Sequence, residues 1–245
     1  ISELFVMISA FMFIHKRYHL IMFGAHPFVR VAASWRRILR MGIPSMLSSI
    51  LTPVSAAVVI KIVSGFGEAA VAAVGVAGRI EMFAFMIPMT VGISLVPFIA
   101  QNHGAKRYDR IRTVRKGAML FALGYGFFIA TVFLFIARPL GMLFSSDPAV
   151  IDVLVRYIYI TCFGYGFLEV HRYATFCFTG IYKPMLSTWL TALRVVVLMV
   201  PLALLGSKLF GLYGIFWGRL LTDIFAATIG IFWTHRVLKK MVPGR

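Results

Sequence analysis

The residues most able to do chemistry are five charged side chains that lie within apolar stretches of the chain: Glu81, Glu169, Arg172, Arg194 and Asp223. If such a stretch crosses a membrane, a charge near its centre costs about 2.5 to more than 10 kcal/mol, so each charge should face a partner or water. Carboxylates in that position can bind a cation or carry a proton. We therefore interpret these five residues as candidates for cation coupling or substrate binding.

Glu169 is the carboxylate placed most centrally in its apolar stretch. Arg172 follows three residues later on the same helical face, so the two side chains can pair. In a functional interpretation, Glu169 takes up a proton or a cation, and Arg172 or Arg194 controls its ionisation. In a structural interpretation, the pair only holds helices together. The sequence leaves both interpretations open.

The other two carboxylates favour structural interpretations. Arg219 and Asp223 are four residues apart in the last apolar stretch, which predicts a pair on one helical face. Glu81 follows Arg79 at the expected start of a helix, where a carboxylate gains from the helix dipole. Interface anchoring is therefore favoured for both, with a substrate role as the alternative. His171 is interpreted as a packing histidine.

Composition places these charges in a membrane protein. The 245 residues are 60% hydrophobic and 13% charged, against about 45–50% and about 25% in soluble domains. The net charge of +17 would suggest nucleic acid in a soluble protein, but Lys and Arg here gather between apolar runs, where they set topology instead. We expect a lipid bilayer as partner and no nucleic acid.

No motif for cofactor or enzyme chemistry is present. Cys162 and Cys177 lack the spacing of a metal site or a disulfide framework and are interpreted as small buried apolar residues. HExxH and GxSxG motifs and a phosphate-binding loop are missing, so an enzyme is not expected. We expect no cofactor and no bound metal besides a coupling ion.

Six apolar runs predict membrane-spanning helices, since about 20 residues cross the hydrocarbon. Prolines within these runs are tolerated where neighbouring helices satisfy the freed backbone groups. Small residues at 65–78 predict a short packed helix that enters the second span. The expected spans are Met41–Ser64, Met82–Ala100, Gly117–Ala137, Val150–Thr179, Met185–Leu205 and Leu212–Thr234.

Basic residues alternate between connections. Residues 15–40, residues 102–116 and the tail are strongly basic, whereas 65–78, 139–149 and 206–211 hold few Lys or Arg. The positive-inside rule places the basic set, and with it the C-terminus, in the cytoplasm. Arg138-Pro139 and the SSDP sequence at 145–148 predict a turn, with Asp147 or Ser146 as the N-cap of the next helix.

The chain begins in an apolar segment that is too short to span a membrane and is followed at once by basic residues. We expect residues 1–14 to be the end of a truncated transmembrane helix and 15–40 a cytoplasmic linker with an amphipathic helix. Residues 41–234 should form a six-helix transmembrane lobe, and 235–245 a cytoplasmic tail. The predicted fold class is all-α, a polytopic membrane helix bundle.

An adaptable apolar pocket could be lined by aromatic rings and thioethers that lie close together in the sequence. These are Met82, Phe83, Phe85, Met86 and Met89. Contact with lipid or ordinary packing explains the same residues equally well.

Residues 63–112 resemble the start of the C-terminal lobe of the multidrug and toxic compound extrusion (MATE) transporters. Three further pieces of the family pattern lie in the expected order on both sides of this stretch: LRMGIPSMLSSILTPVS at 39–55 before it, and FTGIYKP at 178–184 and GLYGIFWGRLLTDI at 211–224 after it. The resemblance covers essentially the whole chain from about residue 39 onward.

The resemblance implies two six-helix lobes, of which this chain supplies the second, with the N-terminal lobe of the same protein as its partner. It implies antiport in which a drug-like and often cationic compound leaves the cytoplasm as Na⁺ or H⁺ enters, at a bacterial plasma membrane. A lipid or polysaccharide flippase of the same broad superfamily is the alternative, and it should show more cationic residues in its central cavity. Many members carry a carboxylate in the lobe's first helix, but residues 41–64 contain none.

Overall fold

The structure is a computed structural model that describes residues 2–18 and 28–241. Contacts divide the chain into two compact units, residues 1–40 and residues 41–245. The first unit contains α1 and the start of α2, and the second contains all remaining elements. The site described below lies entirely within residues 41–245.

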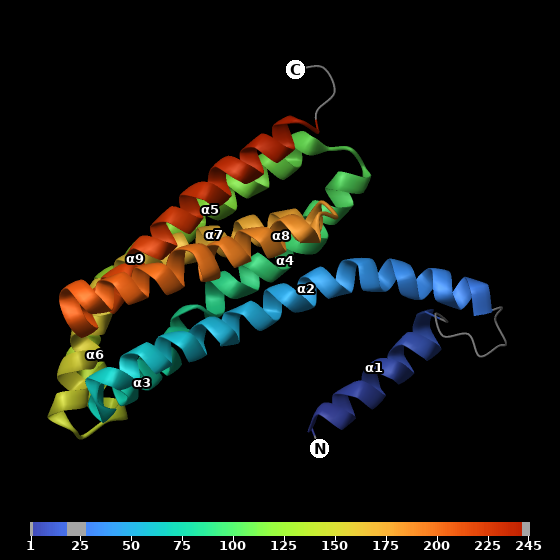
Figure 1. Ribbon diagram of the computed structural model, residues 1–245. Coiled ribbons are helices and arrows are strands. Elements are labelled where there is room, and N and C mark those ends of the chain that lie inside the picture. The colour runs from blue at the N-terminus through green and yellow to red at the C-terminus, as the bar shows by residue number, and fades with distance from the viewer. Residues whose placement is uncertain (1, 19–27, 242–245) are drawn as a thin grey trace. The chain divides into compact units, whose positions relative to one another are not determined.

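Every element in the described residues is helical, which confirms the all-α class (Figure 1). In chain order the elements are α1 (Ser2–Tyr18), α2 (Phe28–Val63), η1 (Ser64–Phe66), α3 (Glu68–Ala84), α4 (Met86–Gly104), α5 (Tyr108–Phe144), α6 (Pro148–Thr161), η2 (Cys162–Gly164), α7 (Tyr165–Gly180), α8 (Pro184–Ala192), η3 (Leu193–Met199) and α9 (Val200–Lys239). Of the short elements, η1 and η2 are 3₁₀ turns, and η3 is a π-helical stretch.

Among the described residues, four helical stretches are long and apolar enough to cross a membrane: Val31–Phe66, Tyr108–Phe144, Pro148–Gly180 and Pro184–Lys239. The bent pair α3 and α4 makes a fifth. The last stretch has 56 residues and reverses direction within α9, so it makes two passes. Together these match the six predicted spans, and the chain is an integral membrane protein.

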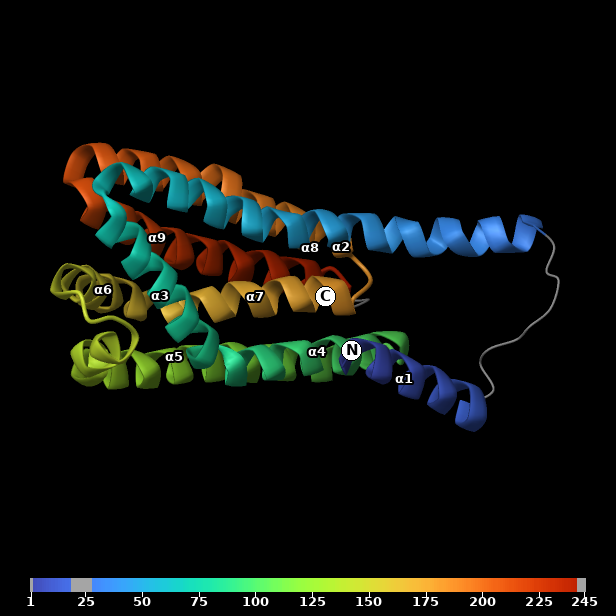
Figure 2. The same cartoon turned by 90° about the horizontal axis from the view of Figure 1, so that it is seen from below.

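The reversal within α9 occurs at Gly211, whose φ of 63° and ψ of −143° interrupt the helix. A positive φ suits glycine because it has no Cβ. The two arms then pack so closely that a Cβ on Gly206 or Gly214 would collide with the backbone of the other glycine. Figures 1 and 2 show the second arm running back beside the first. These glycines explain how the predicted connection at 206–211 becomes a tight hairpin.

The run Met82–Ala100 is not one continuous helix, contrary to prediction. The helix breaks at Phe85, and α3 and α4 meet there at a bend of 56°. Pro88 has no backbone N–H and so leaves the carbonyl of Ala84 free at this break. The hydroxyl of Tyr125 on α5 donates to that carbonyl at 2.9 Å. A neighbouring helix therefore satisfies the group that the proline frees.

Two smaller predictions meet different outcomes in α5 and α6. Arg138-Pro139 does not form a turn, because Pro139 lies inside α5 and the helix continues to Phe144. Asp147 does cap α6, since its side chain accepts from the N–H of Ala149 at 2.9 Å. The predicted helix at 65–78 is present as the first part of α3.

The amphipathic stretch predicted within 15–40 falls partly outside the described residues, which omit 19–27. α1 extends to Tyr18, and the described part of the stretch from Phe28 is continuous with the first span in α2. A position at a membrane surface stays a prediction. The boundary between the two compact units falls between Arg40 and Met41, inside this helix.

α7 is the central helix of the second unit. It packs against α4, α5, α8 and α9, and Figure 2 shows it between α9 on one side and α4 and α5 on the other. Its large side chains Tyr165, Tyr173 and Phe178 are fully buried. The helix that carries Glu169 and Arg172 is thereby held from several sides.

Candidate functional site: a charged transmembrane cavity

A cavity of about 890 Å³ lies between α2, α3, α4, α6, α7, α8, η3 and the hairpin of α9. Its wall combines hydroxyl groups with apolar and aromatic surface. The hydroxyl residues are Ser45, Ser48, Ser49, Thr52 and Ser55 on α2, Thr175 and Thr179 on α7, and Ser187 and Thr191 on α8. Such a mixture suits a small organic molecule, since ligand sites combine apolar lining with a few placed polar groups.

The α2 side of the cavity is tied to α8 by hydrogen bonds. The hydroxyl of Ser48 donates to Thr188 Oγ1 at 2.9 Å, and Thr188 in turn donates to the carbonyl of Pro44 at 2.7 Å. These bonds hold two walls of the cavity together at one end.

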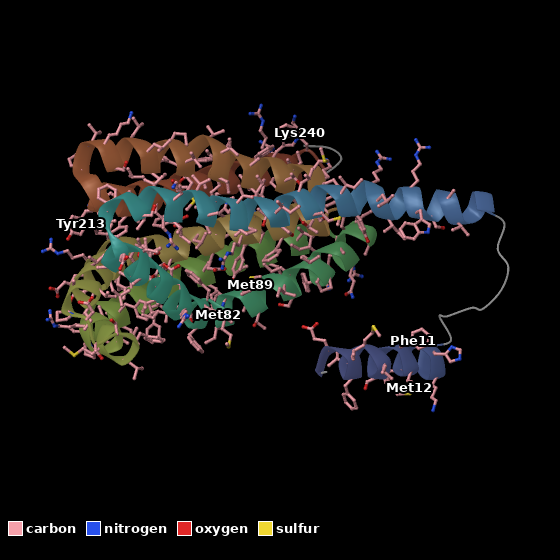
Figure 3. The ribbon with its side chains drawn as sticks, turned by 60° about the horizontal axis from the view of Figure 1, so that its bottom comes forward. Phe11, Met12, Met82, Met89, Tyr213 and Lys240 are labelled. Atoms are coloured by element: carbon pink, nitrogen blue, oxygen red, sulfur yellow. The ribbon has the colours of Figure 1, made fainter. Side chains whose placement is uncertain are left out.

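Of the five rings and thioethers that the sequence singled out, three line the cavity: Met82, Phe85 and Met89. They lie on both sides of the break between α3 and α4, and Figure 3 labels the two methionines. Phe83 and Met86 are exposed and outside the lining. Because α3 and α4 meet at a bend, this apolar run lines the cavity from two helix directions.

Glu81 is the acceptor at the centre of a four-residue cluster. Arg219 Nη2 lies 2.8 Å from Glu81 Oε2. The hydroxyls of Tyr157 and Tyr165 donate to Glu81 Oε1 at 2.8 and 3.2 Å. The Arg219 guanidinium also lies over the Tyr157 ring, 5.4 Å from its centroid. The cluster links α3, α6, α7 and α9.

These contacts correct two predictions. Glu81 is not at a helix start: it lies near the C-terminal end of α3 and is buried. Arg219 does not pair with Asp223, although the two lie one turn apart on α9. Each has a partner on another helix instead, because packing brings a nearer opposite charge.

Asp223 is paired with Arg194. Its Oδ1 accepts from Arg194 Nη2 at 2.6 Å and from Nε at 3.1 Å. Arg194 belongs to the π-helical stretch η3, and Asp223 to the second arm of α9. The pair therefore crosslinks two passes of the membrane.

Glu169 and Arg172 pair as their spacing predicts, with 2.5 Å between Arg172 Nη1 and Glu169 Oε1. The guanidinium lies over the Phe85 ring, 5.0 Å from its centroid. The second carboxylate oxygen, Oε2, is buried and has no hydrogen-bond partner among the described residues. An unsatisfied buried acceptor is rare and calls for an explanation.

The structure thus brings all five predicted site residues into one charged region within residues 41–245. His171, Arg172, Arg194 and Glu81 line the cavity, as does Arg219. Sequence reasoning missed Tyr157 and Tyr165 as partners of Glu81. Their only signal was a hydroxyl in an apolar helix, which must find an acceptor when it is buried.

Comparisons with known proteins find similar proteins among named membrane transporters. A FAD transporter of Shewanella oneidensis is 30% identical over 208 residues, covering 85% of this chain and 46% of that protein. The multidrug export protein MepA of Staphylococcus haemolyticus is 25% identical over 225 residues, covering 87% and 47%. The chain spans about half the length of these relatives.

Among solved structures, the Vibrio cholerae MATE transporter VcmN in its bent form aligns with a TM-score of 0.83 and 29% identity, covering 86% of this chain and 48% of that one. A MOP superfamily transporter from Pyrococcus furiosus shares the fold at a TM-score of 0.85 and 18% identity, covering 96% and 54%. The model of the MatE family matches residues 44–205. With this match over most of its length, and with the helical lobe described above, the chain belongs to the MatE family of membrane transporters.

Proposed function

We propose that this chain is the second lobe of a two-lobed exporter that moves drug-sized organic compounds out of the cell in exchange for Na⁺ or H⁺. The cavity of about 890 Å³, with its mixed hydroxyl and apolar wall, supports a small-molecule substrate. Relatives named as multidrug export proteins support efflux. The N-terminal lobe of the same protein would supply the other half of the transport path, since transporters of this type move one lobe against the other.

The main support for the ion-coupling part of this proposal is the environment of the Glu169 carboxylate. Its carboxylate is buried in α7 beside the cavity, one oxygen is held by Arg172, and the other has no partner. Such an oxygen can accept a Na⁺ ion or a proton without breaking the existing pair. We therefore assign coupling to Glu169 rather than to Glu81, whose two oxygens are both taken by hydrogen bonds.

The protein would lie in the plasma membrane of a bacterium with its C-terminus in the cytoplasm. The basic connection between α4 and α5, the connection between α7 and α8, and the end of α9 lie at one end of the second unit in Figure 2. This clustering supports the orientation expected from the positive-inside rule.

A second candidate is export of an anionic compound, which includes the lipid or polysaccharide flippase alternative. The specific observation in its favour is the set of three arginines that line the cavity, Arg172, Arg194 and Arg219. A relative named as a FAD transporter adds support. Both candidates share the lobe, the cavity and the ion-driven cycle, and they differ in the charge of the cargo.

The test of coupling is Glu169→Gln in the full-length transporter. The amide oxygen can still accept a hydrogen bond from Arg172, so protein level and thermal stability should stay nearly unchanged. Because an amide cannot take up the coupling proton or replace the carboxylate charge, ion-driven efflux from proteoliposomes should fall about tenfold or more. Asp152→Asn is the matched control, because Asp152 also pairs with an arginine but is exposed on α6.

Normal ion-coupled efflux by a stable Glu169→Gln protein would remove Glu169 from the mechanism. A variant that loses stability before efflux would assign Glu169 to the structural pair with Arg172 instead.

A further inference from the structure

The three ion pairs of the cavity wall are not symmetric with respect to the cavity. The carboxylates are sunk into the protein: the exposed fractions of the side chains are 1% for Glu169, 3% for Asp223 and 11% for Glu81. Their arginine partners reach further out, at 32% for Arg172, 12% for Arg194 and 20% for Arg219. In every pair the guanidinium is the more exposed member.

The lining of the cavity reflects this asymmetry. All three guanidinium groups line it, whereas Glu81 is the only one of the three carboxylates that does so. The six charges sum to zero over the cluster. A molecule inside the cavity nevertheless meets three positive groups and one negative group, so its anionic part is attracted and its cationic part is repelled.

The arginines also keep hydrogen-bond donors for a ligand. A guanidinium has five N–H donors. Arg172 and Arg219 each give one hydrogen bond to their carboxylate, and Arg194 gives two. Within the described ranges, 2–18 and 28–241, these three side chains have no other hydrogen-bond acceptor. Most of their donors therefore stay available.

The guanidinium groups are held in place before a ligand arrives. Arg172 is fixed between Glu169 and the Phe85 ring, and Arg219 between Glu81 and the Tyr157 ring. Because the planar fork of an arginine matches a carboxylate or phosphate, a fork that is already fixed loses less entropy on binding. The neighbouring rings and thioethers offer an apolar surface to the remainder of the molecule.

From this arrangement we propose that the cavity binds an anion, a carboxylate or phosphate ester of an aromatic or apolar compound, through Arg172, Arg194 and Arg219. The proposal rests on the exporter function above and specifies its substrate class. It differs from the cationic substrate that the family resemblance implies. The cavity volume is within the range of about 300–1,000 Å³ for small-molecule sites.

The experiment compares two probes that differ only in a phosphate, riboflavin and riboflavin 5′-phosphate (FMN), on the full-length protein in nanodiscs. Binding is followed by the fluorescence anisotropy of the flavin, without an ion gradient. FMN should bind about tenfold or more tightly than riboflavin, since hydrogen bonds to a charged group are the strong ones. The cationic dye ethidium should bind more weakly than FMN.

The double variant Glu169→Gln/Arg172→Gln removes one guanidinium without leaving an unpaired charge. It should reduce FMN affinity about tenfold and change riboflavin affinity little. The matched control, Arg138→Gln/Asp152→Asn, removes an ion pair that is exposed and does not line the cavity, and it should leave both affinities unchanged. If the first variant does not fold, Arg172→Lys keeps the pair, removes the planar fork and should give a smaller loss for FMN alone.

A competition arm separates two sources of the phosphate. Displacement of FMN by short-chain phosphatidic acid, but not by the matching diacylglycerol, assigns the site to a lipid headgroup. FMN binding that phosphatidic acid does not displace assigns the site to a soluble phosphate ester. Either result supports the anion site.

Equal affinity for riboflavin and FMN, tighter binding of ethidium, absence of FMN binding, or FMN affinity that survives the loss of Arg172 would overturn the proposal. The exporter function is decided separately. If FMN binds through the arginines but no compound is exported under an ion gradient, the exporter fails and the anion site stands. If compounds are exported and FMN does not bind, the anion site fails and the exporter stands.

Discussion

Two regions of this lobe bury arginines in opposite ways. In the cavity wall, each of Arg172, Arg194 and Arg219 lies against a carboxylate. Where α5 and α9 meet near the basic end, Arg115 is 5% exposed, and its hydrogen-bond partners among the described residues are both neutral: the Thr234 hydroxyl at 3.2 Å and the Met119 sulfur at 3.5 Å. Its Nε is buried without a hydrogen-bond partner in the described part of the chain.

The contrast between the cavity-wall arginines and Arg115 shows what a buried carboxylate contributes to this lobe. In the cavity wall it fixes a guanidinium in one position and cancels its charge, so that truncation of the carboxylate to an apolar side chain leaves the guanidinium without its acceptor. Arg115 has no such dependence. It begins a long apolar run in a basic stretch, and its side chain is buried between α5 and α9 against Met119 and Thr234. Three substitutions separate these two situations.

The largest effect is expected for Glu81→Ala. It leaves Arg219 without its carboxylate and removes the acceptor of the Tyr157 and Tyr165 hydroxyls, a change that costs about 3–5 kcal/mol where one partner of a buried pair is lost. Thermal unfolding of the full-length protein in detergent should show a large fall in Tm. The double variant Glu81→Gln/Arg219→Gln should recover much of it, and an unchanged Tm for Glu81→Ala would show that the cluster does not stabilise the lobe.

A smaller effect is expected for Arg115→Met. Methionine fills a similar volume and removes a buried charge that has no carboxylate partner within residues 2–18 and 28–241, so the stability should change by no more than about 1 kcal/mol in either direction. The same unfolding experiment measures it. A loss as large as that of Glu81→Ala would mean that the two regions do not differ in the way described.

The smallest effect is expected for Arg138→Gln/Asp152→Asn. This pair is 58% and 60% exposed with 3.3 Å between its charged atoms, so the change should stay below about 0.5 kcal/mol. A clear fall in Tm would indicate that ion pairs stabilise this lobe wherever they lie, which would remove the contrast between the interior and the surface.

Much of the fold could be predicted from the sequence because its main signals are local. Apolar runs of spanning length indicated six passes, and the SSDP sequence indicated the cap at Asp147. The break at Phe85 was not predicted, since neither Phe85 nor its neighbours are helix breakers. Pro88, three residues further on, was its signal, and the compensating hydroxyl of Tyr125 comes from another helix.

In the candidate site, too, contacts between residues close in the sequence could be predicted, and contacts between distant residues could not. Glu169 and Arg172 are three residues apart and pair as predicted. Glu81 and Arg219 are separated by 138 positions, so nothing in their local spacing indicates that they meet. The prediction of an Arg219–Asp223 pair was wrong for this reason. Residues one turn apart can pair, but here each side chain lies closer to an opposite charge on another element: Glu81 for Arg219 and Arg194 for Asp223.

The π-helical stretch Leu193–Met199 gives the cavity wall a dependence on chain length. A π-helical turn contains one residue more than an α-helical turn. The five residue steps from Arg194 to Met199 therefore cover about the rotation that four steps cover in an α-helix, and both residues line the cavity. In an uninterrupted α-helix, five steps would carry Met199 about 100° further round the helix axis, away from the face of Arg194. Deletion of one exposed residue of the stretch, such as Val196, should leave an ordinary helix in which Arg194 and Met199 still share a face, whereas straightening the stretch without a deletion would turn Met199 away.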